Sequence, residues 1–255
     1  YDRTTGIWQT VWLEPVPAAF IRRLRLTPDL DRATLHVEAE IDGDAGALTV
    51  EAVAIDAGEE VARGLTMPGE RTLALHIARP RPWWPELPHL YGLRLRLLRG
   101  EQEVDRVDSN FGLRKVSIEG RNILLNNRPY YQRLVLDQGY WPDGQYTAPS
   151  DDALRADVLW TRAYGFNGAR KHQKVEDPRW LYWADRLGLL VWGEIGNCGL
   201  YHYSREAMAN LRAEWQEALA RDYNHPCIVT WVPFNESWGI WGVRDQKEVQ
   251  QGVID

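Results

Sequence analysis

The stretch GFNGARKHQKVEDPRWLYWADRLGLLVWGE, residues 165–194, decides the fold of the second half of the chain. A short apolar strand from Phe166 to Arg170 opens it, and an amphipathic helix follows from about Asp177 to Leu187. Gly188 is of the residue type that commonly ends a helix, and a second apolar strand runs from Leu189 to Trp192. A helix that connects two strands in this way predicts that the strands are parallel neighbours in one sheet.

The same alternation continues on both sides of this stretch. A strand is predicted over Tyr130–Leu136, and Ser150 is a predicted N-cap for a helix that runs to about Tyr164. Further along, a helix is predicted over Arg205–Asp222 and a strand over Ile228–Val232. Four such strand–helix units fit either an open doubly wound sheet or half of an eight-stranded barrel. No Gly-rich phosphate turn follows the first strand, which disfavours a dinucleotide-binding sheet and hence a dehydrogenase.

The chain before Val116 has a different hydrophobic period. Between Ile21 and Arg99, apolar and polar residues alternate in short runs that turn-forming residues separate. The apolar positions of these runs are Leu24, Leu26, Leu35, Val37, Ala39, Ile41, Leu73, Leu75, Ile77, Leu93, Leu95 and Leu97. A period of two, broken by turns, predicts an antiparallel β-sandwich.

Composition excludes several classes of partner. With 255 residues, of which 44% are hydrophobic, the chain can bury a sizeable core over one or two domains. A formal net charge of -6 leaves no basic surface for nucleic acid, and no apolar run approaches the roughly 20 residues of a membrane span. We therefore expect no nucleic-acid and no membrane partner. The 13 Trp and 11 Tyr against 4 Phe suit sugar stacking as well as core packing.

Cysteine, histidine and serine patterns predict no metal site, no cofactor and no serine hydrolase. Cys198 and Cys227 form no disulfide framework, so a cytoplasmic location is slightly favoured while localisation stays unknown. Cys198 and His202 have a metal-like spacing, but no second pair completes a set of four ligands. No Gly-x-Ser-x-Gly stretch occurs.

Polar residues directly follow each predicted strand of the second half. In parallel barrels the loops after the strands build the active site, so these strand ends supply the candidate residues. The strand ends are Leu136-Asp137-Gln138, Arg170-Lys171-His172, Gly193-Glu194 and Phe234-Asn235-Glu236-Ser237-Trp238.

Glu236 is the candidate general acid/base of a glycosidase. Retaining glycoside hydrolysis needs two carboxyls about 5 to 5.5 Å apart, one protonated and one ionised. Trp231, Phe234 and Trp238 would raise the pKa of the Glu236 carboxyl towards the useful range. The neighbouring amide of Asn235 could hold a sugar hydroxyl. A solvated loop acid is the alternative for Glu236.

The other candidates have structural alternatives as well. Glu194 is either a second carboxylate of the site or an ion partner of Arg170, and Asp137 either binds sugar or caps a loop. Lys171 and His172 either line the cleft or form an ordinary surface pair.

Several stretches taken together resemble glycoside hydrolase family 2, the group of β-galactosidases, β-glucuronidases and β-mannosidases. The similar stretches are Gly6–Leu13, Trp83–Tyr91, Phe111–Arg114, Leu124–Pro129 with Arg133, Gly165–Asn167 with Arg170, Asp177–Glu194, Asn224–Trp231 and Asn235–Ser237. The resemblance implies the end of an N-terminal sugar-binding jelly-roll domain over residues 1–17 and an immunoglobulin-like β-sandwich over residues 18–115. It also implies a partial TIM barrel, the first half of a (β/α)8 barrel, over residues 116–255.

The resemblance further implies a retaining exo-β-glycoside hydrolase, β-galactosidase-like or β-glucuronidase-like, that acts on terminal β-linked sugars. A carbohydrate is then the expected partner, with homo-oligomer formation left open. Glu236 matches the family's acid/base. The predicted substrate-binding residues are Asn235, Asp137, Arg170, Lys171, His172, Glu194 and Trp238. A carbohydrate-binding or scaffolding protein that kept the fold without catalysis is the alternative.

The chain departs from the family pattern in several places. Galactosidases of the family usually have a His-Glu pair after the first strand, whereas Asp137-Gln138-Gly139 stand here, so a metal-assisted galactose site is not expected. Gln173 stands where a substrate His is common. The family's nucleophile is a Glu at the end of the seventh strand, and this sequence stops at Asp255, soon after the fourth. We therefore expect a fragment, truncated at both ends, that lacks the nucleophile.

Overall fold

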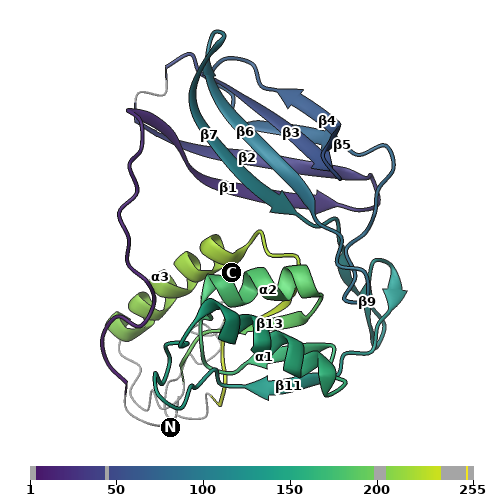
Figure 1. Cartoon of the computed structure of the whole chain (residues 1–255), viewed down its shortest axis with the longest axis vertical. Helices are drawn as coiled ribbons and strands as arrows, with labels where there is room; N and C mark the ends of the chain where they lie inside the picture. The colour runs from purple at the N-terminus through teal and green to yellow at the C-terminus, as the bar shows by residue number, and fades with distance from the viewer. Residues whose placement is uncertain (1–3, 44–45, 198–204, 237–250, 252–255) are drawn as a thin grey trace. The chain divides into compact units, whose positions relative to one another are not determined.

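The computed structural model describes residues 4–43, 46–197, 205–236 and 251. These residues belong to two compact units (Figure 1). The sandwich unit comprises Thr10–Tyr131 and Asn224–Pro226, and the barrel unit comprises Tyr1–Gln9, Gln132–Tyr223 and Cys227–Asp255. Within the described ranges, no helix combines the length and the apolar character needed to cross a membrane.

Two antiparallel sheets form the sandwich unit. One has the strand order β1-β2-β5, with bounds β1 Ala19–Asp29, β2 Thr34–Gly43 and β5 Thr72–His76. The other has the order β4-β3-β6-β7, with bounds β4 Glu59–Leu65, β3 Thr49–Asp56, β6 Tyr91–Arg99 and β7 Gln102–Phe111. The alternating leucines of β1, β2 and β6 all belong to one buried core. The antiparallel β-sandwich predicted from this alternation, which the resemblance described as immunoglobulin-like, is therefore the observed fold of the first half.

A small antiparallel sheet follows the sandwich. Its strand order is β10-β9-β8, with bounds β8 Val116–Glu119, β9 Asn122–Leu125 and β10 Arg128–Pro129. The prediction that a strand of the parallel sheet begins at Tyr130 is wrong for its first residues. The Tyr130 amide donates to the Ile123 carbonyl at 3.0 Å and so extends this small sheet, whereas the next strand begins only at Leu134.

Four parallel strands in the order β11-β12-β13-β14 form the sheet of the barrel unit. Their bounds are β11 Leu134–Asp137, β12 Gly168–Lys171, β13 Leu190–Glu194 and β14 Ile228–Val232. The helices between them are α1 Asp151–Ala163, α2 Pro178–Leu187 and α3 Arg205–Asp222 (Figure 1). Each strand pairs with the next one in the chain, which is the arrangement of the first half of a (β/α)8 barrel, as the sequence predicted.

The predicted helix signals have the expected geometry. Ser150 Oγ accepts from the Ala153 amide at 3.1 Å and caps α1, and Asp177 Oδ1 accepts from the Arg179 amide at 2.9 Å and caps α2. Gly188 has a φ of 75°, in the left-handed region that favours glycine, and it ends α2. The side chains of the two N-cap residues therefore determine where the loops after β11 and β12 end and the helices begin.

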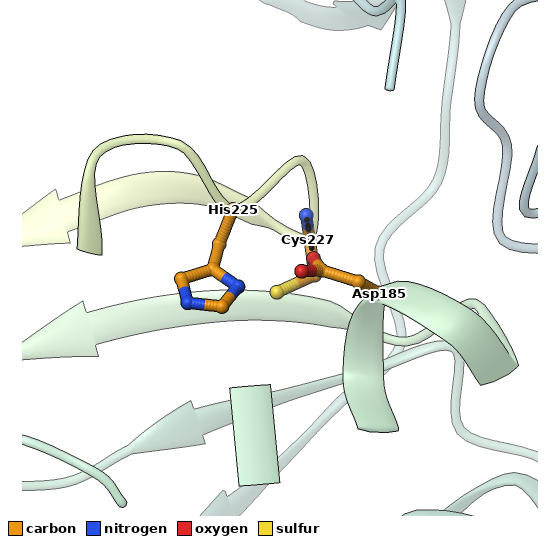
Figure 2. Close-up of side chains that lie close together, drawn as sticks. All are labelled: Asp185, His225 and Cys227. Carbon is orange, nitrogen blue, oxygen red and sulfur yellow. Dashed lines mark hydrogen bonds between the residues drawn. The ribbon is translucent and has the colours of Figure 1, made fainter. Parts of the chain in front are cut away.

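Cys227 is buried at the start of β14. Its amide donates to Asp185 Oδ1 of α2 at 2.9 Å (Figure 2), and its carbonyl accepts from the Val191 amide at 2.8 Å. These contacts hold the residue directly before β14 to both α2 and β13. Cys198 and His202 lie outside the described residues.

The two sides of the parallel sheet differ in what covers them. Residues in register on neighbouring parallel strands point to the same side, and adjacent residues along a strand point to opposite sides. Asp137 pairs with Lys171, and Lys171 Nζ lies 4.3 Å from the ring centroid of Trp180 in α2, so this is the helix side. Arg170 directly precedes Lys171 and therefore points to the other side of the sheet, and Glu194 lies there as its ion partner. We call this side, which faces away from the helices, the barrel side.

Candidate active site

Three predicted residues meet on the barrel side at the carboxyl end of the sheet. Arg170 Nε donates to Glu194 Oε2 at 2.8 Å, and Arg170 Nη2 donates to Asn235 Oδ1 at 2.7 Å. The amide of Gln173 donates to Glu194 Oε1 at 3.0 Å, so both carboxylate oxygens of Glu194 are engaged. The Glu194 side chain is 0% exposed and that of Arg170 is 28% exposed. We call Arg170, Glu194 and Asn235 the barrel-side cluster.

Asn235 is held from several directions but keeps one amide proton donor open. Its backbone amide donates to Asn197 Oδ1 at 3.0 Å, and Asn197 Nδ2 donates to the Pro233 carbonyl at 2.7 Å. Within the part of the chain that the structure describes, Asn235 Nδ2 is buried and has no hydrogen-bond partner. A buried donor without a partner costs free energy that an incoming acceptor would recover. This atom is therefore suited to bind a ligand oxygen.

Glu236 follows Asn235 in a strained conformation. Its φ is 49°, in the left-handed region that non-glycine residues rarely adopt, and such strain clusters at functional sites. The expected apolar surroundings are not found among the described residues. Glu236 is exposed, while Trp231 and Phe234 pack against a buried group on the α3 side that includes Trp215. The reason is the alternation of side chains along the strands. Trp231 pairs with Gly193, the neighbour of the barrel-side Glu194, and therefore faces the helices. Trp238 lies outside the described residues.

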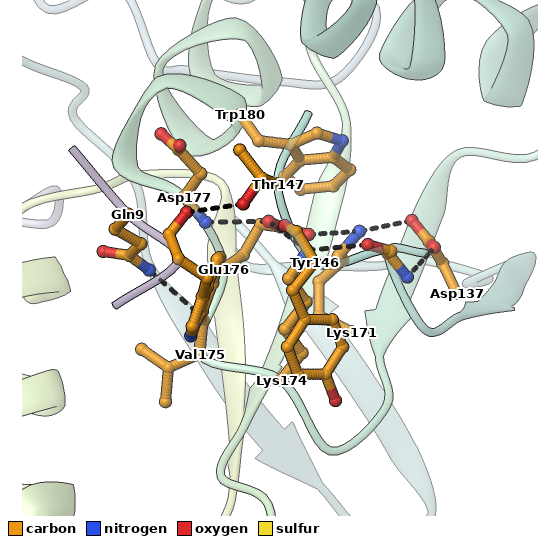
Figure 3. Close-up of polar contacts among 12 residues, drawn as sticks. Gln9, Asp137, Tyr146, Thr147, Lys171, Lys174, Val175, Glu176, Asp177 and Trp180 are labelled. Atoms are coloured by element: carbon orange, nitrogen blue, oxygen red, sulfur yellow. Dashed lines mark hydrogen bonds and ion pairs between the residues drawn. The ribbon is translucent and has the colours of Figure 1, made fainter. Parts of the chain in front are cut away.

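A second charged group lies on the helix side (Figure 3). Lys171 Nζ forms an ion pair with Asp137 Oδ2 and another, at 2.6 Å, with Glu176 Oε2. Glu176 Oε1 lies 3.1 Å from Lys174 Nζ, so the four charges alternate in sign. The Lys171 side chain is 1% exposed. We call Asp137, Lys171, Glu176 and Lys174 the helix-side cluster.

The helix-side cluster shifts its own pKa values. Burial acts to raise the pKa of Asp137, but the charge and hydrogen bond of Lys171 outweigh it and hold that pKa below its usual 3.8. Burial acts to lower the pKa of Lys171, and Glu176, Asp137 and Asp157 together raise it instead. Burial raises the pKa of Asp157, whose Oδ2 accepts from Trp180 Nε1 at 2.6 Å. Lys171 is therefore charged at neutral pH.

His172 follows Lys171 directly, beyond the end of β12. Its Nδ1 lies 3.1 Å from Gln138 Nε2, and its amide donates to the Asp137 carbonyl at 2.8 Å. The structure thus joins the ends of β11 and β12 through residues of both strands. The surface-pair alternative for Lys171 and His172 is wrong, because both residues are buried.

Several residues of this edge were missed from the sequence. Gln138, Gln173, Lys174, Glu176 and Asn197 all bond to predicted site residues or to the loop that carries them. Gln138 belongs to the strand end Leu136-Asp137-Gln138, but no site role was predicted for it. The others lie within six residues after a strand end, so a wider window at each carboxyl end would have included them.

Two family models match the chain. The model described as Glycosyl hydrolases family 2 matches residues 19–114, and the one described as Glycosyl hydrolases family 2, TIM barrel domain, matches residues 116–251.

Curated relatives have similar sequences over most of the chain. A beta-galactosidase of Aeromonas hydrophila is 29% identical over 263 residues, and beta-galactosidase 2 of Enterobacter cloacae is 31% identical over 261 residues. Each alignment covers 92% of this chain and 25% of the relative. The chain thus spans about a quarter of the length of these relatives.

Solved structures have a similar backbone. A β-glucuronidase from Ruminococcus gnavus, in complex with N1-substituted uronic isofagomine, superposes with a TM-score of 0.80 at 25% identity. That match covers 93% of this chain and 40% of the other. A beta-D-glucuronidase of Dictyoglomus thermophilum superposes with a TM-score of 0.79 at 21% identity, over 93% and 42% of the two chains, and shows likeness of fold alone.

Proposed function

The chain belongs to glycosyl hydrolases family 2, and from that premise we propose that the protein hydrolyses terminal β-linked sugars with retention of configuration. The observation that carries the proposal is the open amide of Asn235 beside the strained Glu236 at the end of β14. The relatives are beta-galactosidases and the superposable enzymes are β-glucuronidases, so a β-galactoside or a β-glucuronide is the proposed substrate class. The proposed domains are residues 1–17, 18–115 and 116–255, as expected from the resemblance.

Glu236 is the proposed general acid/base. It protonates the leaving oxygen in the first step and activates water in the second, as retention requires. Glu236 is exposed, so its carboxyl is accessible to a substrate. Its backbone follows that of Asn235, which is held by hydrogen bonds to Asn197 and Arg170. Asn235 Nδ2 would donate to the sugar 2-hydroxyl.

Glu194 is not proposed as the nucleophile, although it is a carboxylate of the same edge. Its side chain is fully buried, and its two oxygens accept from Arg170 and from the Gln173 amide. A nucleophile needs a free oxygen that reaches the anomeric carbon. Glu194 instead orients Arg170, which in turn orients Asn235, and no residue of this chain is assigned as the nucleophile.

The other predicted residues complete the proposed site. Arg170, His172 and Trp238 are proposed to surround the sugar together with Asn235. Asp137, also expected to bind sugar, has its carboxylate on the helix side in the ion pair with Lys171 and is proposed to support the site from there. Lys171 belongs to the same strand end as His172, but its side chain is buried on the helix side and is not proposed to contact the sugar.

The test is hydrolysis of a panel of chromogenic β-glycosides by the product of the complete gene and by its Glu236→Gln variant. General acid/base catalysis contributes about 10² to 10⁴-fold, so the variant should lose at least about 10²-fold in kcat on substrates with poor leaving groups. Glu217→Gln, an exposed acid on α3, is the matched control and should retain full activity.

Equal rates for wild type and Glu236→Gln would remove the acid/base assignment. A folded protein that cleaves none of the panel would instead favour a binding protein that kept the fold without catalysis.

A further inference from the structure

The ends of β11 and β12 carry two neighbouring contacts. Asp137 and Lys171 face the helices, and directly after them Gln138 Nε2 lies 3.1 Å from His172 Nδ1. Between the two contacts, the His172 amide donates to the Asp137 carbonyl at 2.8 Å. The ion pair and the Gln138–His172 contact are therefore joined through single peptide units, so a change in the ion pair displaces the contact.

The helix-side cluster also fixes the loop that leaves β11. Asp137 Oδ1 accepts from the Gly139 amide at 2.7 Å, and the Gly139 carbonyl accepts from Lys174 Nζ at 2.8 Å. Gly139 has a φ of 62°, and a Cβ there would lie 2.6 Å from Lys174 Nζ. Lys174 also donates to the Tyr146 carbonyl at 3.3 Å. A side chain at this position would displace Lys174 and would occupy a backbone conformation that favours glycine, and the cluster holds the loop at two points.

The cluster has no positive charge to spare for a substrate. Its two lysines and two acids alternate and compensate each other, and Asp157 of α1 faces the same group. Trp180 of α2 covers Lys171 Nζ at 4.3 Å. A fully buried lysine with two carboxylate partners cannot bind a sugar carboxylate or hydroxyl directly without breaking an existing ion pair. Its effect on the site must pass through the residues it holds.

We propose that Lys171 is a positioning residue, whose ion pair with Asp137 fixes the ends of β11 and β12 so that Gln138 and His172 form one sugar-contacting pair. The inference rests on the proposed glycosidase function. It adds Gln138 to the residues that contact the sugar. It also assigns Lys171 an indirect role, in which Lys171 holds Asp137 and does not itself bind the substrate. The Gln138–His172 pair then contributes to the choice of sugar through the polar atoms of both side chains, which lie 3.1 Å apart.

The experiment compares Lys171→Met, His172→Ala, Gln138→Ala and the double variant Lys171→Met/His172→Ala in the complete gene product. A hydrogen bond to substrate that is lost or misplaced costs about tenfold, so each single variant should raise KM about tenfold while kcat falls less than about threefold. The double variant should resemble His172→Ala alone, because both changes remove the same contact. Lys115→Met is the control, because it also removes a lysine from an ion pair, here with Asp31 in the sandwich unit, and it should leave KM unchanged.

The outcomes separate this inference from the proposed function. An active wild type with an unchanged KM in Lys171→Met, or additive effects in the double variant, would overturn the positioning role while leaving the glycosidase assignment intact. If Lys171→Met does not fold, Gln138→Ala decides, because an unchanged KM there removes the sugar-contacting pair and with it the inference. A wild type that hydrolyses no glycoside would overturn both.

Discussion

The two sides of one parallel sheet use buried charge in opposite ways. On the barrel side, Arg170 and Glu194 form an ion pair whose remaining contact, Asn235, keeps a buried donor without a partner among the described residues. On the helix side, Asp137, Lys171 and their partners compensate each other in a closed chain. Residue type does not distinguish the two groups, since both contain acids and a base. The difference is whether a polar group is left for a ligand.

The largest effect should come from breaking the barrel-side ion pair. Glu194→Ala leaves the half-buried charge of Arg170 and the Gln173 amide without their partner. Removing one member of a buried pair typically costs 3 to 5 kcal/mol, and because Arg170 is partly exposed we expect about 3 kcal/mol. The shift in the midpoint of urea unfolding, followed by tryptophan fluorescence, measures this loss.

The matched control for this change is Glu214→Ala, which removes an exposed acid from α3 and should change stability by less than about 0.5 kcal/mol. If the two alanine variants unfold at the same urea concentration, then Glu194 does not hold the barrel-side cluster and the contrast between the two sides is weaker than described here.

The helix side should respond in opposite directions to two similar substitutions, Asp137→Asn and Asp157→Asn. Lys171 lowers the pKa of Asp137 in spite of its burial, so its contribution to stability is present above pH 3.8 and is lost as the pH falls through the lowered value. Burial raises the pKa of Asp157, so its charge opposes folding at neutral pH and that cost disappears as the pH falls. At pH 7 we expect Asp137→Asn to lose about 2 kcal/mol and Asp157→Asn to change little or to gain stability.

The measurement is the melting temperature of both variants between pH 3 and pH 8. The difference between wild type and Asp137→Asn should shrink towards acid pH, because the wild-type carboxyl is then protonated as well. A loss of equal size in both variants at pH 7 would mean that the two carboxyls share one environment, contrary to their opposite shifts.

Much of this architecture could be predicted from sequence because it depends on local chemistry. Ser150, Asp177 and Gly188 set the helix ends through their own backbone contacts, and the apolar period set the sandwich. The family and the fold class were also predicted correctly. The candidate residues that the structure describes lie at one edge of the sheet, and their roles stay predictions.

The side of the sheet that each candidate occupies could not be predicted. Adjacent residues such as Arg170 and Lys171 go to opposite sides, and in a strand that is apolar on both faces the sequence does not show which of the two faces the helices. The strand placed from Tyr130 in fact begins at Leu134, and β12 ends at Lys171 rather than Arg170. Of the apolar residues expected around Glu236, the two that the structure describes, Trp231 and Phe234, pack on the helix side. The side of the sheet that each side chain faces is therefore known only from the structure.

The smallest expected effect tests whether stability and the sugar site are separable on the helix side. Ser150→Ala removes the cap that accepts from the Ala153 amide, and loss of such a cap costs about 1 kcal/mol. The cap lies at the far end of the loop from Gly139, and no contact of Ser150 reaches the helix-side cluster among the hydrogen bonds described. We therefore expect a lower melting temperature with an unchanged KM, opposite to the pattern expected for Lys171→Met. If Ser150→Ala raises KM as much as Lys171→Met does, then general loosening of the β11–α1 loop explains both effects, and the ion pair has no particular role.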